Sequence, residues 1–175
     1  AGPMLSRVEI PIDDTITSEA LEARLADAGA ALLVRTLDAL EAGAVPETPQ
    51  DDAAVTYAAR LERCDGQIDW SRSALAIHNQ IRGLHPWPLA SALWREKRVI
   101  LRGSEPFSTD SVVLGTEQPG AIVRLDADAI VVATGSGWLR ILDVQLEGRR
   151  AQSAREFING ARPSVGDVFA PLPGL

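Results

Sequence analysis

The sequence predicts a mainly β fold with helices, in which a small OB-fold-like barrel follows helical segments. Three observations predict it. Apolar residues recur at helical spacing before residue 43, residues 44–56 hold prolines and acids without periodicity, and short alternating apolar runs follow residue 89. Five or six short strands, with no edge long enough for a sandwich, favour a small closed barrel.

The first segment, residues 1–12, alternates polar and apolar side chains and is predicted to form a strand that ends at its proline. Thr17 or Ser18 then caps a long helix that ends at Gly43. We expect the apolar stripe of this helix to pack as ordinary core. The stripe contains Leu21, Leu25, Ala28, Leu32, Thr36 and Leu40, widened by Leu33 and Leu37.

Residues 44–56 are predicted to be a linker. A second helix is predicted after them, capped by Ser71 or Ser73 and ending at Gly83. Its inward residues are expected to be Leu75, Ile77 and Ile81.

The barrel strands are predicted from residue 89 onward. A Gly-Ser-Gly turn at 135–137 joins the last two of them, and Ser153 caps a short helix that ends at residues 159–160. A final strand is expected at 165–169. The other strands are expected near 89–94, 98–103, 111–114, 120–125, 129–134 and 138–144.

Residues that could carry chemistry are few. Cys64, His78 and His85 are the only thiol or imidazole groups, and they show neither CxxC nor HxxxH spacing, so we predict no metal site. No nucleophile motif is present, and we expect no catalytic residue in this chain. No apolar run approaches about 18 residues and no leader opens the chain, so we expect a cytoplasmic protein with no membrane partner.

Charge divides the chain in two. Residues 1–56 carry 3 Arg against 11 Asp and Glu, a net of −8, whereas residues 57–175 carry 13 Arg and one Lys against 13 acids, a net of +1. Arginine suits phosphate contacts, although a solvated basic surface explains the composition equally well. The candidate nucleic-acid contacts are Arg60, Arg63, Arg82, Lys97, Arg98, Arg149 and Arg150.

Two of these candidates, Arg60 and Arg63, are spaced by three and are expected to share one face of a short helical turn. The aromatic and proline residues nearby are assigned a structural part, which is to fix the second helix on the barrel. They are Trp70, Pro86, Trp87 and Pro88, with the Trp87 ring expected to be buried between helix and barrel.

Three blocks give this stretch a specific resemblance. Thr56-Tyr57-Ala58, Gln67-Ile68-Asp69-Trp70 and Ile81-Arg82-Gly83-Leu84-His85-Pro86-Trp87-Pro88 resemble the C-terminal half of methionyl-tRNA formyltransferases. Two positions depart from the family pattern. His85 stands where the family has Asn, and Leu89-Ala90 stands where it has Gly-Ala.

The resemblance implies a domain organisation. Residues 1–43 look like the last strand and helix of the family's α/β catalytic domain, 44–56 like the linker, and 57–175 like the C-terminal OB-like tRNA-binding domain. The family's catalytic residues lie upstream of the segment that matches Ala1. We therefore expect a fragment that has no activity alone.

The resemblance also implies a function. The whole enzyme would transfer a formyl group from 10-formyltetrahydrofolate to the α-amino group of initiator methionyl-tRNA in translation initiation. This chain would bind no cofactor, and its partners would be that tRNA and the missing N-terminal catalytic domain. Arg60 falls on the family's basic residue after the Thr-Tyr-Ala block. Two alternatives remain: the C-terminal domain of a sugar-nucleotide or formyltetrahydrofolate enzyme, or a barrel with a purely structural part.

Overall fold

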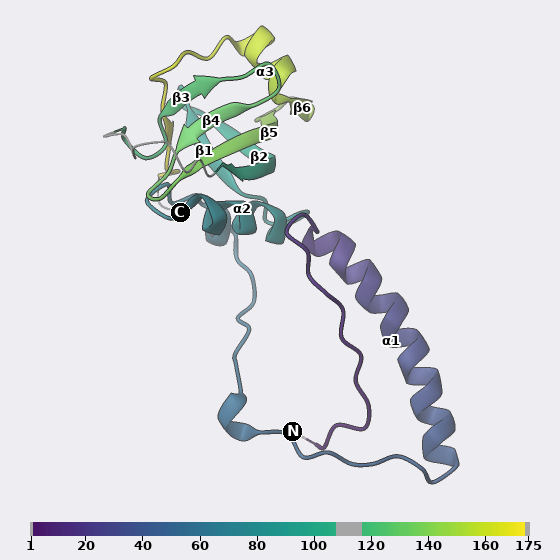
Figure 1. Cartoon of the computed structure of the whole chain (residues 1–175). Helices are drawn as coiled ribbons and strands as arrows, with labels where there is room; N and C mark the ends of the chain where they lie inside the picture. Colours follow the sequence, from purple (N-terminus) through teal and green to yellow (C-terminus); the bar gives the residue numbers. More distant parts are fainter. Residues whose placement is uncertain (1, 108–116, 174–175) are drawn as a thin grey trace. The chain divides into compact units, whose positions relative to one another are not determined.

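The computed structural model describes residues 2–107 and 117–173. The chain divides into two units, the first ending at Arg60 and the second beginning at Leu61. Figure 1 shows a long helix in the first and a curled sheet with shorter helices in the second. No helix in the described ranges is long and apolar enough to cross a membrane.

The main element of the first unit is helix α1, Ser18–Glu41. As predicted, Thr17 caps it, because the Thr17 hydroxyl accepts from the Ala20 N–H at 3.3 Å. Gly43 follows the helix with φ +66°. However, α1 has no buried residue, so the prediction that its stripe packs as core is wrong for this chain. The other segments of the first unit are extended, acidic and rich in proline, and they offer no apolar layer to it.

The predicted strand at residues 1–12 is also wrong. Among the described residues 2–12, only Met4 pairs, in an isolated antiparallel bridge to Thr48 with N–H to O distances of 2.8 and 2.9 Å. Alternation alone does not make a strand, because the backbone groups need a neighbouring strand to bond. The predicted linker contains one short helical turn, η1, Asp52–Ala54.

In its described part, the second unit forms one seven-stranded antiparallel sheet in the order β3-β4-β5-β2-β1-β7, with β6 paired to β5. Backbone bonds at 2.7 and 2.8 Å, from Ile122 to Asp167 and from Phe169 to Gly120, join the two ends of the sheet. The strands are β1 Ser91–Trp94, β2 Lys97–Phe107, β3 Ile122–Leu125, β4 Ile130–Ala133, β5 Trp138–Leu146, β6 Gln152–Ser153 and β7 Phe169–Ala170.

This curled sheet confirms the predicted mainly β, barrel-like fold. The strand predicted at 111–114 lies outside the described residues. Strand β2 runs beyond its predicted end at 103 because β5 continues to pair with it as far as Phe107, opposite Trp138. The pairing register shifts at Gly103, and the alternation of apolar and polar residues is broken there. The full length of the strand could therefore not be predicted from the alternation.

Helix α2, Ala74–Gly83, begins where predicted, with the Ser73 hydroxyl accepting from the Ala76 N–H at 3.2 Å. Its buried face contains Ala74, Ile77, His78 and Ile81. Leu75 was predicted to face inward, but it is exposed because it lies about 100° around the helix from Ala74.

Helix α3, Ala154–Ala161, is closed at its start by a capping box in which the Ser153 hydroxyl and the Glu156 carboxylate each accept a backbone N–H from the other residue. Its Phe157 is fully buried. Figure 1 places α2 across one end of the sheet and α3 near the other. The large core residues include Ile68, Trp70, Ile77, Trp94, Leu101, Ile130, Leu139, Ile141, Phe157 and Phe169.

Candidate nucleic-acid interface

The four residues predicted to have a structural role, Trp70, Pro86, Trp87 and Pro88, differ in burial. Trp70 is 4% exposed and its ring packs against Phe169, with the ring centroids 5.8 Å apart. Pro88 is buried, whereas Pro86 and Trp87 are exposed. Trp87 is 52% exposed, so the prediction of a buried ring is wrong. The chain turns back here, with the Leu89 N–H bonding the Leu84 carbonyl at 3.0 Å, and this turn directs Trp87 outward.

The two arginines predicted to share a helical turn do not share one. The short helix η2 is Arg63–Gly66, with Glu62 as its N-cap, and Arg60 precedes it in a segment without helix. Both arginines are exposed. Asp65 closes the start of η2 through its carboxylate, which accepts from the Glu62 N–H at 2.7 Å, and so the helical turn excludes Arg60.

Two other candidate contacts are partly buried by their own elements. The Arg82 Nε donates to Asn79 Oδ1 at 2.8 Å within the last turn of α2. The Arg98 Nε donates to the Ser91 hydroxyl at 3.2 Å, across the β1–β2 pair. These hydrogen bonds orient both side chains along the protein surface, which reduces their freedom to reach a ligand.

Lys97 and Arg149 do come together. They line a hollow of about 490 Å³ at one edge of the barrel, which we call the cationic hollow. It is lined by Trp94, Arg95, Lys97, Leu146, Glu147, Arg149, Gly160 and Ala161.

Strand register explains how residues 52 positions apart meet. Val99 lies opposite Leu146 in the β2–β5 pair, and the Glu147 N–H continues the ladder to the Arg98 carbonyl at 3.0 Å. The start of β2 therefore lies beside the turn that follows β5. Lys97 reaches the hollow from the first and Arg149 from the second.

Arg95 is a basic residue of the hollow that the sequence pattern did not single out. It lies with Glu96 in the two-residue connection between β1 and β2, and both have positive φ, 48° and 63°. Such turns are usually signalled by Asn-Gly or Asp-Gly. The break in alternation between two apolar runs was the available signal for this turn. The turn was not recognised because Arg-Glu stands where Asn-Gly or Asp-Gly would be expected.

The charges of the hollow are unequal. Arg95, Lys97 and Arg149 face one lining carboxylate, that of Glu147. Arg95 is paired with Asp167 at 2.9 Å, whereas Lys97 and Arg149 make no ion pair with any residue that the structure describes. The hollow therefore offers a positive field in a partly enclosed surface, which favours an anionic ligand.

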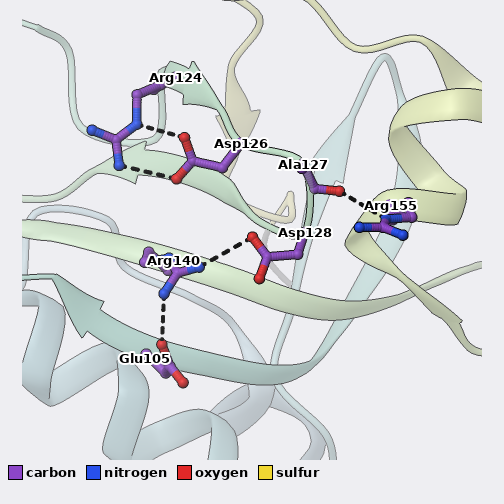
Figure 2. A network of polar contacts seen from close by, with 7 residues as sticks. All are labelled: Glu105, Arg124, Asp126, Ala127, Asp128, Arg140 and Arg155. Carbon is purple, nitrogen blue, oxygen red and sulfur yellow. Dashed lines mark hydrogen bonds and ion pairs between the residues drawn. The ribbon is translucent and has the colours of Figure 1, made fainter.

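Three arginines on β3, β5 and α3 are placed very differently from those of the hollow (Figure 2). The Arg124 guanidinium binds both oxygens of Asp126, at 2.8 and 3.0 Å. The Arg140 guanidinium bridges Glu105 at 3.0 Å and Asp128 at 3.3 Å. The Arg155 Nε donates to the Ala127 carbonyl at 3.1 Å. We call this set the ion-paired face, and its acids largely neutralise its basic side chains.

Arg150, the last candidate, supports helix α3. Its guanidinium lies 2.9 Å from Glu156. The Ser153 backbone N–H, and then Arg150, hold the pKa of the Glu156 carboxyl below its ordinary value. Arg150 thus stabilises the charged form of a capping residue rather than standing ready for a ligand.

Metal or nucleophile chemistry finds little support in the described ranges. There, no group of three or more His, Cys, Asp or Glu side chains is placed to hold a metal ion. His78 is buried, with its Nδ1 3.1 Å from the Ser104 hydroxyl, and Cys64 is exposed in η2.

Several curated relatives carry the name methionyl-tRNA formyltransferase. The chain is 41% identical over 172 residues to a methionyl-tRNA formyltransferase of Koribacter versatilis, covering 98% of this chain and 53% of the relative. It is 42% identical over 161 residues to the enzyme of Solibacter usitatus, covering 92% and 50%. The Bacillus subtilis enzyme is 34% identical over 170 residues, covering 97% and 52%. The chain thus spans about half the length of these relatives.

Solved structures share the fold at low identity. HypX from Aquifex aeolicus superimposes with a TM-score of 0.62 at 16% identity, covering 95% of this chain and 30% of that one. An N-formyltransferase from Helicobacter canadensis has a TM-score of 0.59 at 14% identity, covering 80% and 49%. The family model for the formyl transferase C-terminal domain matches residues 60–162. Because this match takes in more than half of the chain, the chain belongs to the formyl transferase family through its C-terminal domain.

Proposed function

We propose that this chain is the tRNA-binding portion of a methionyl-tRNA formyltransferase, acting in the cytoplasm. The whole enzyme would transfer a formyl group from 10-formyltetrahydrofolate to the α-amino group of initiator methionyl-tRNA. Relatives with that name at 34–42% identity support the assignment.

The observation that carries the tRNA part is the cationic hollow. Lys97 and Arg149 reach it from two different elements and remain without an ion pair among the described residues. Sequence-independent contacts to the phosphate backbone supply much of the affinity of proteins for nucleic acids. A hollow with basic side chains on an OB-like barrel suits that use.

The seven candidate contacts are then ranked by their environment. Lys97 and Arg149 are proposed as the principal phosphate contacts, and the exposed Arg60 and Arg63 as secondary ones. The remaining three already have partners within the protein and are proposed to contribute less. They are Arg82, Arg98 and Arg150.

A domain organisation follows as part of the proposal. Residues 1–43 would complete the catalytic domain, 44–56 would link, and 57–175 would hold the tRNA. The exposed apolar side chains of α1, such as Leu33 and Leu37, support a catalytic domain that packs there. Since the chain spans 53% of the Koribacter relative, the rest of such an enzyme would bind the folate and perform the transfer.

The test is tRNA binding by the 175-residue chain as a function of salt. Initiator methionyl-tRNA labelled with a fluorophore would be titrated, with anisotropy as the readout. We expect the logarithm of the association constant to fall with the logarithm of salt concentration by about 0.7–0.9 for each phosphate contact. Binding that is absent or independent of salt would contradict the proposal.

That outcome would favour the second candidate, a barrel that only stabilises its catalytic neighbour. The ion-paired face supports this candidate, because Arg124 and Arg140 are neutralised by acids of the same unit. A structural barrel would bind the separately expressed catalytic half and no tRNA, whereas the proposed module binds tRNA directly.

A further inference from the structure

We propose that Arg95 is a stacking platform for an unpaired nucleobase, beside which Lys97 and Arg149 hold the flanking phosphates. The inference rests on the proposed function and specifies what the cationic hollow recognises. The ligand would be a single-stranded stretch of RNA, in which bases are free to stack, rather than the outside of a duplex.

Arg95 is supported by Trp94, which is 4% exposed. Phe157 of α3 packs against it edge-on, with the centroids 5.0 Å apart. The Trp94 indole N–H donates to Asp167 Oδ2 at 3.2 Å. The ring is therefore held on its inner side by the core and at its polar end by a carboxylate, so its position is fixed.

The Arg95 guanidinium lies over this ring, 4.3 Å from its centroid. Its Nη2 donates to Asp167 at 2.9 Å and to the Arg162 carbonyl at 3.3 Å, and its Nη1 donates to the Ala161 carbonyl at 3.5 Å. Acceptors for N–H groups lie at the edge of the guanidinium plane. These bonds hold the guanidinium in place through its N–H groups and do not occupy its faces.

The Arg95 guanidinium contacts Trp94, and the Arg95 side chain is still 50% exposed. Arg95 also lines the hollow. Arginine planes stack on unpaired bases, as aromatic rings do. The volume of about 490 Å³ lies within the range of about 300–1,000 Å³ that is usual for small-ligand sites.

The backbone supports the same inference. Arg95 and Glu96 both occupy the left-handed region, with φ 48° and 63°, where side chains other than Gly or Asn are disfavoured. Asn-Gly would form this two-residue turn with less strain. Strained residues of this kind gather at functional sites, and the hydrogen bond that Arg95 donates to Asp167 holds this one in place.

The decisive experiment compares two RNAs, a single strand of about eight nucleotides and a duplex with the same number of phosphates per strand. Both would be titrated against the full chain by fluorescence anisotropy. Arg95→Lys keeps the charge but removes the plane. We expect it to weaken single-strand binding by about 5- to 150-fold, the range of one lost base stack, and duplex binding by less than about twofold.

Two further variants separate stacking from charge. Lys97→Ala should weaken binding to both RNAs and flatten the salt slope by about 0.7–0.9, whereas Arg95→Lys should leave the slope unchanged. Asp167→Asn keeps Arg95 but weakens its support, and we expect it to lower the ratio of single-strand to duplex affinity, because the loss of the carboxylate charge affects phosphate binding in both RNAs. This variant decides the question if Arg95→Lys fails to fold.

Arg124→Lys is the matched control. Arg124 also lies over an aromatic ring, 5.0 Å from the centroid of Phe107, and also has a carboxylate partner, but it does not line the hollow. We expect this variant to bind both RNAs as the unchanged chain does. An equal loss in Arg124→Lys and Arg95→Lys would overturn the proposal.

The remaining outcomes distinguish the stack from the proposed function. If Arg95→Lys and Asp167→Asn bind both RNAs normally while Lys97→Ala flattens the salt slope, the stack is refuted and tRNA binding stands. If the unchanged chain binds neither RNA in a salt-dependent way, the proposed function fails and the stacking site fails with it.

Discussion

The cationic hollow and the ion-paired face both contain arginines and acids of the same barrel, yet the first is positive and the second is largely neutral. In the hollow, Lys97 and Arg149 keep their charge available. On the ion-paired face, Arg124 and Arg140 are bound by carboxylates at 2.8–3.3 Å. A count of basic residues along a sequence therefore measures composition and not the charge offered to a ligand.

Strand register is the cause of the difference. Arg140 lies directly opposite Glu105 in the β2–β5 pair, so an acid faces it across the sheet. Lys97 lies opposite Trp94 in the β1–β2 pair and meets no acid there. Glu147, from the turn after β5, lines the hollow but forms no ion pair with a described residue.

The largest predicted effect is on the free energy of unfolding, and it compares the cationic hollow with the ion-paired face. The wall of the hollow rests on Phe157, which is fully buried against Trp94, so Phe157→Ala should lower the free energy of unfolding by about 3–5 kcal/mol. Arg140→Ala removes two ion pairs at the surface and should cost only about 1 kcal/mol. Urea unfolding followed by tryptophan fluorescence measures both. Equal losses would mean that the two regions are supported alike.

The next effect is on tRNA binding. The double variant Lys97→Ala with Arg149→Ala should flatten the log–log salt slope by about 1.4–1.8, since two phosphate contacts are lost. The matched double variant Arg124→Ala with Arg140→Ala removes the same charge from the ion-paired face and should leave the slope nearly unchanged. The contrast between regions would break down if both double variants flattened the slope equally.

The sequence predicted the barrel well because local signals and core pattern agree there. The caps at Thr17, Ser73 and Ser153 lie where the hydroxyl groups indicated them. The wrong predictions depended on neighbours that lie far along the chain. Residues 1–12 lack the partner strand that their alternation required, and Trp87 is directed outward by a turn that its own residue type does not reveal.

The candidate site was half predictable for the same reason. Lys97 and Arg149 were chosen as basic residues, but only the pairing of β2 with β5 brings them to one hollow. Arg95 was missed because its turn uses Arg-Glu at positive φ instead of a recognisable turn pair. Conversely, nothing local marked Arg150 as the partner of a capping carboxylate.

The smallest effect is a gain, and it tests the hollow through its acid. Glu147 is the one lining carboxylate among the residues of the hollow, and it is exposed. A phosphate bound by Lys97 and Arg149 would lie within the screening length of its charge, about 8 Å at physiological salt. Glu147→Gln removes that repulsion while keeping the size of the side chain.

We expect Glu147→Gln to tighten tRNA binding by about 2- to 5-fold at physiological salt, which corresponds to about 0.4–1 kcal/mol for one exposed charge. Glu22→Gln on α1 is the control, because it changes the net charge of −7 by the same amount at an exposed site that does not line the hollow. If both variants tighten binding equally, net charge governs the affinity and the hollow has no special part. A gain confined to Glu147→Gln, and smaller at high salt, places the phosphate beside residue 147.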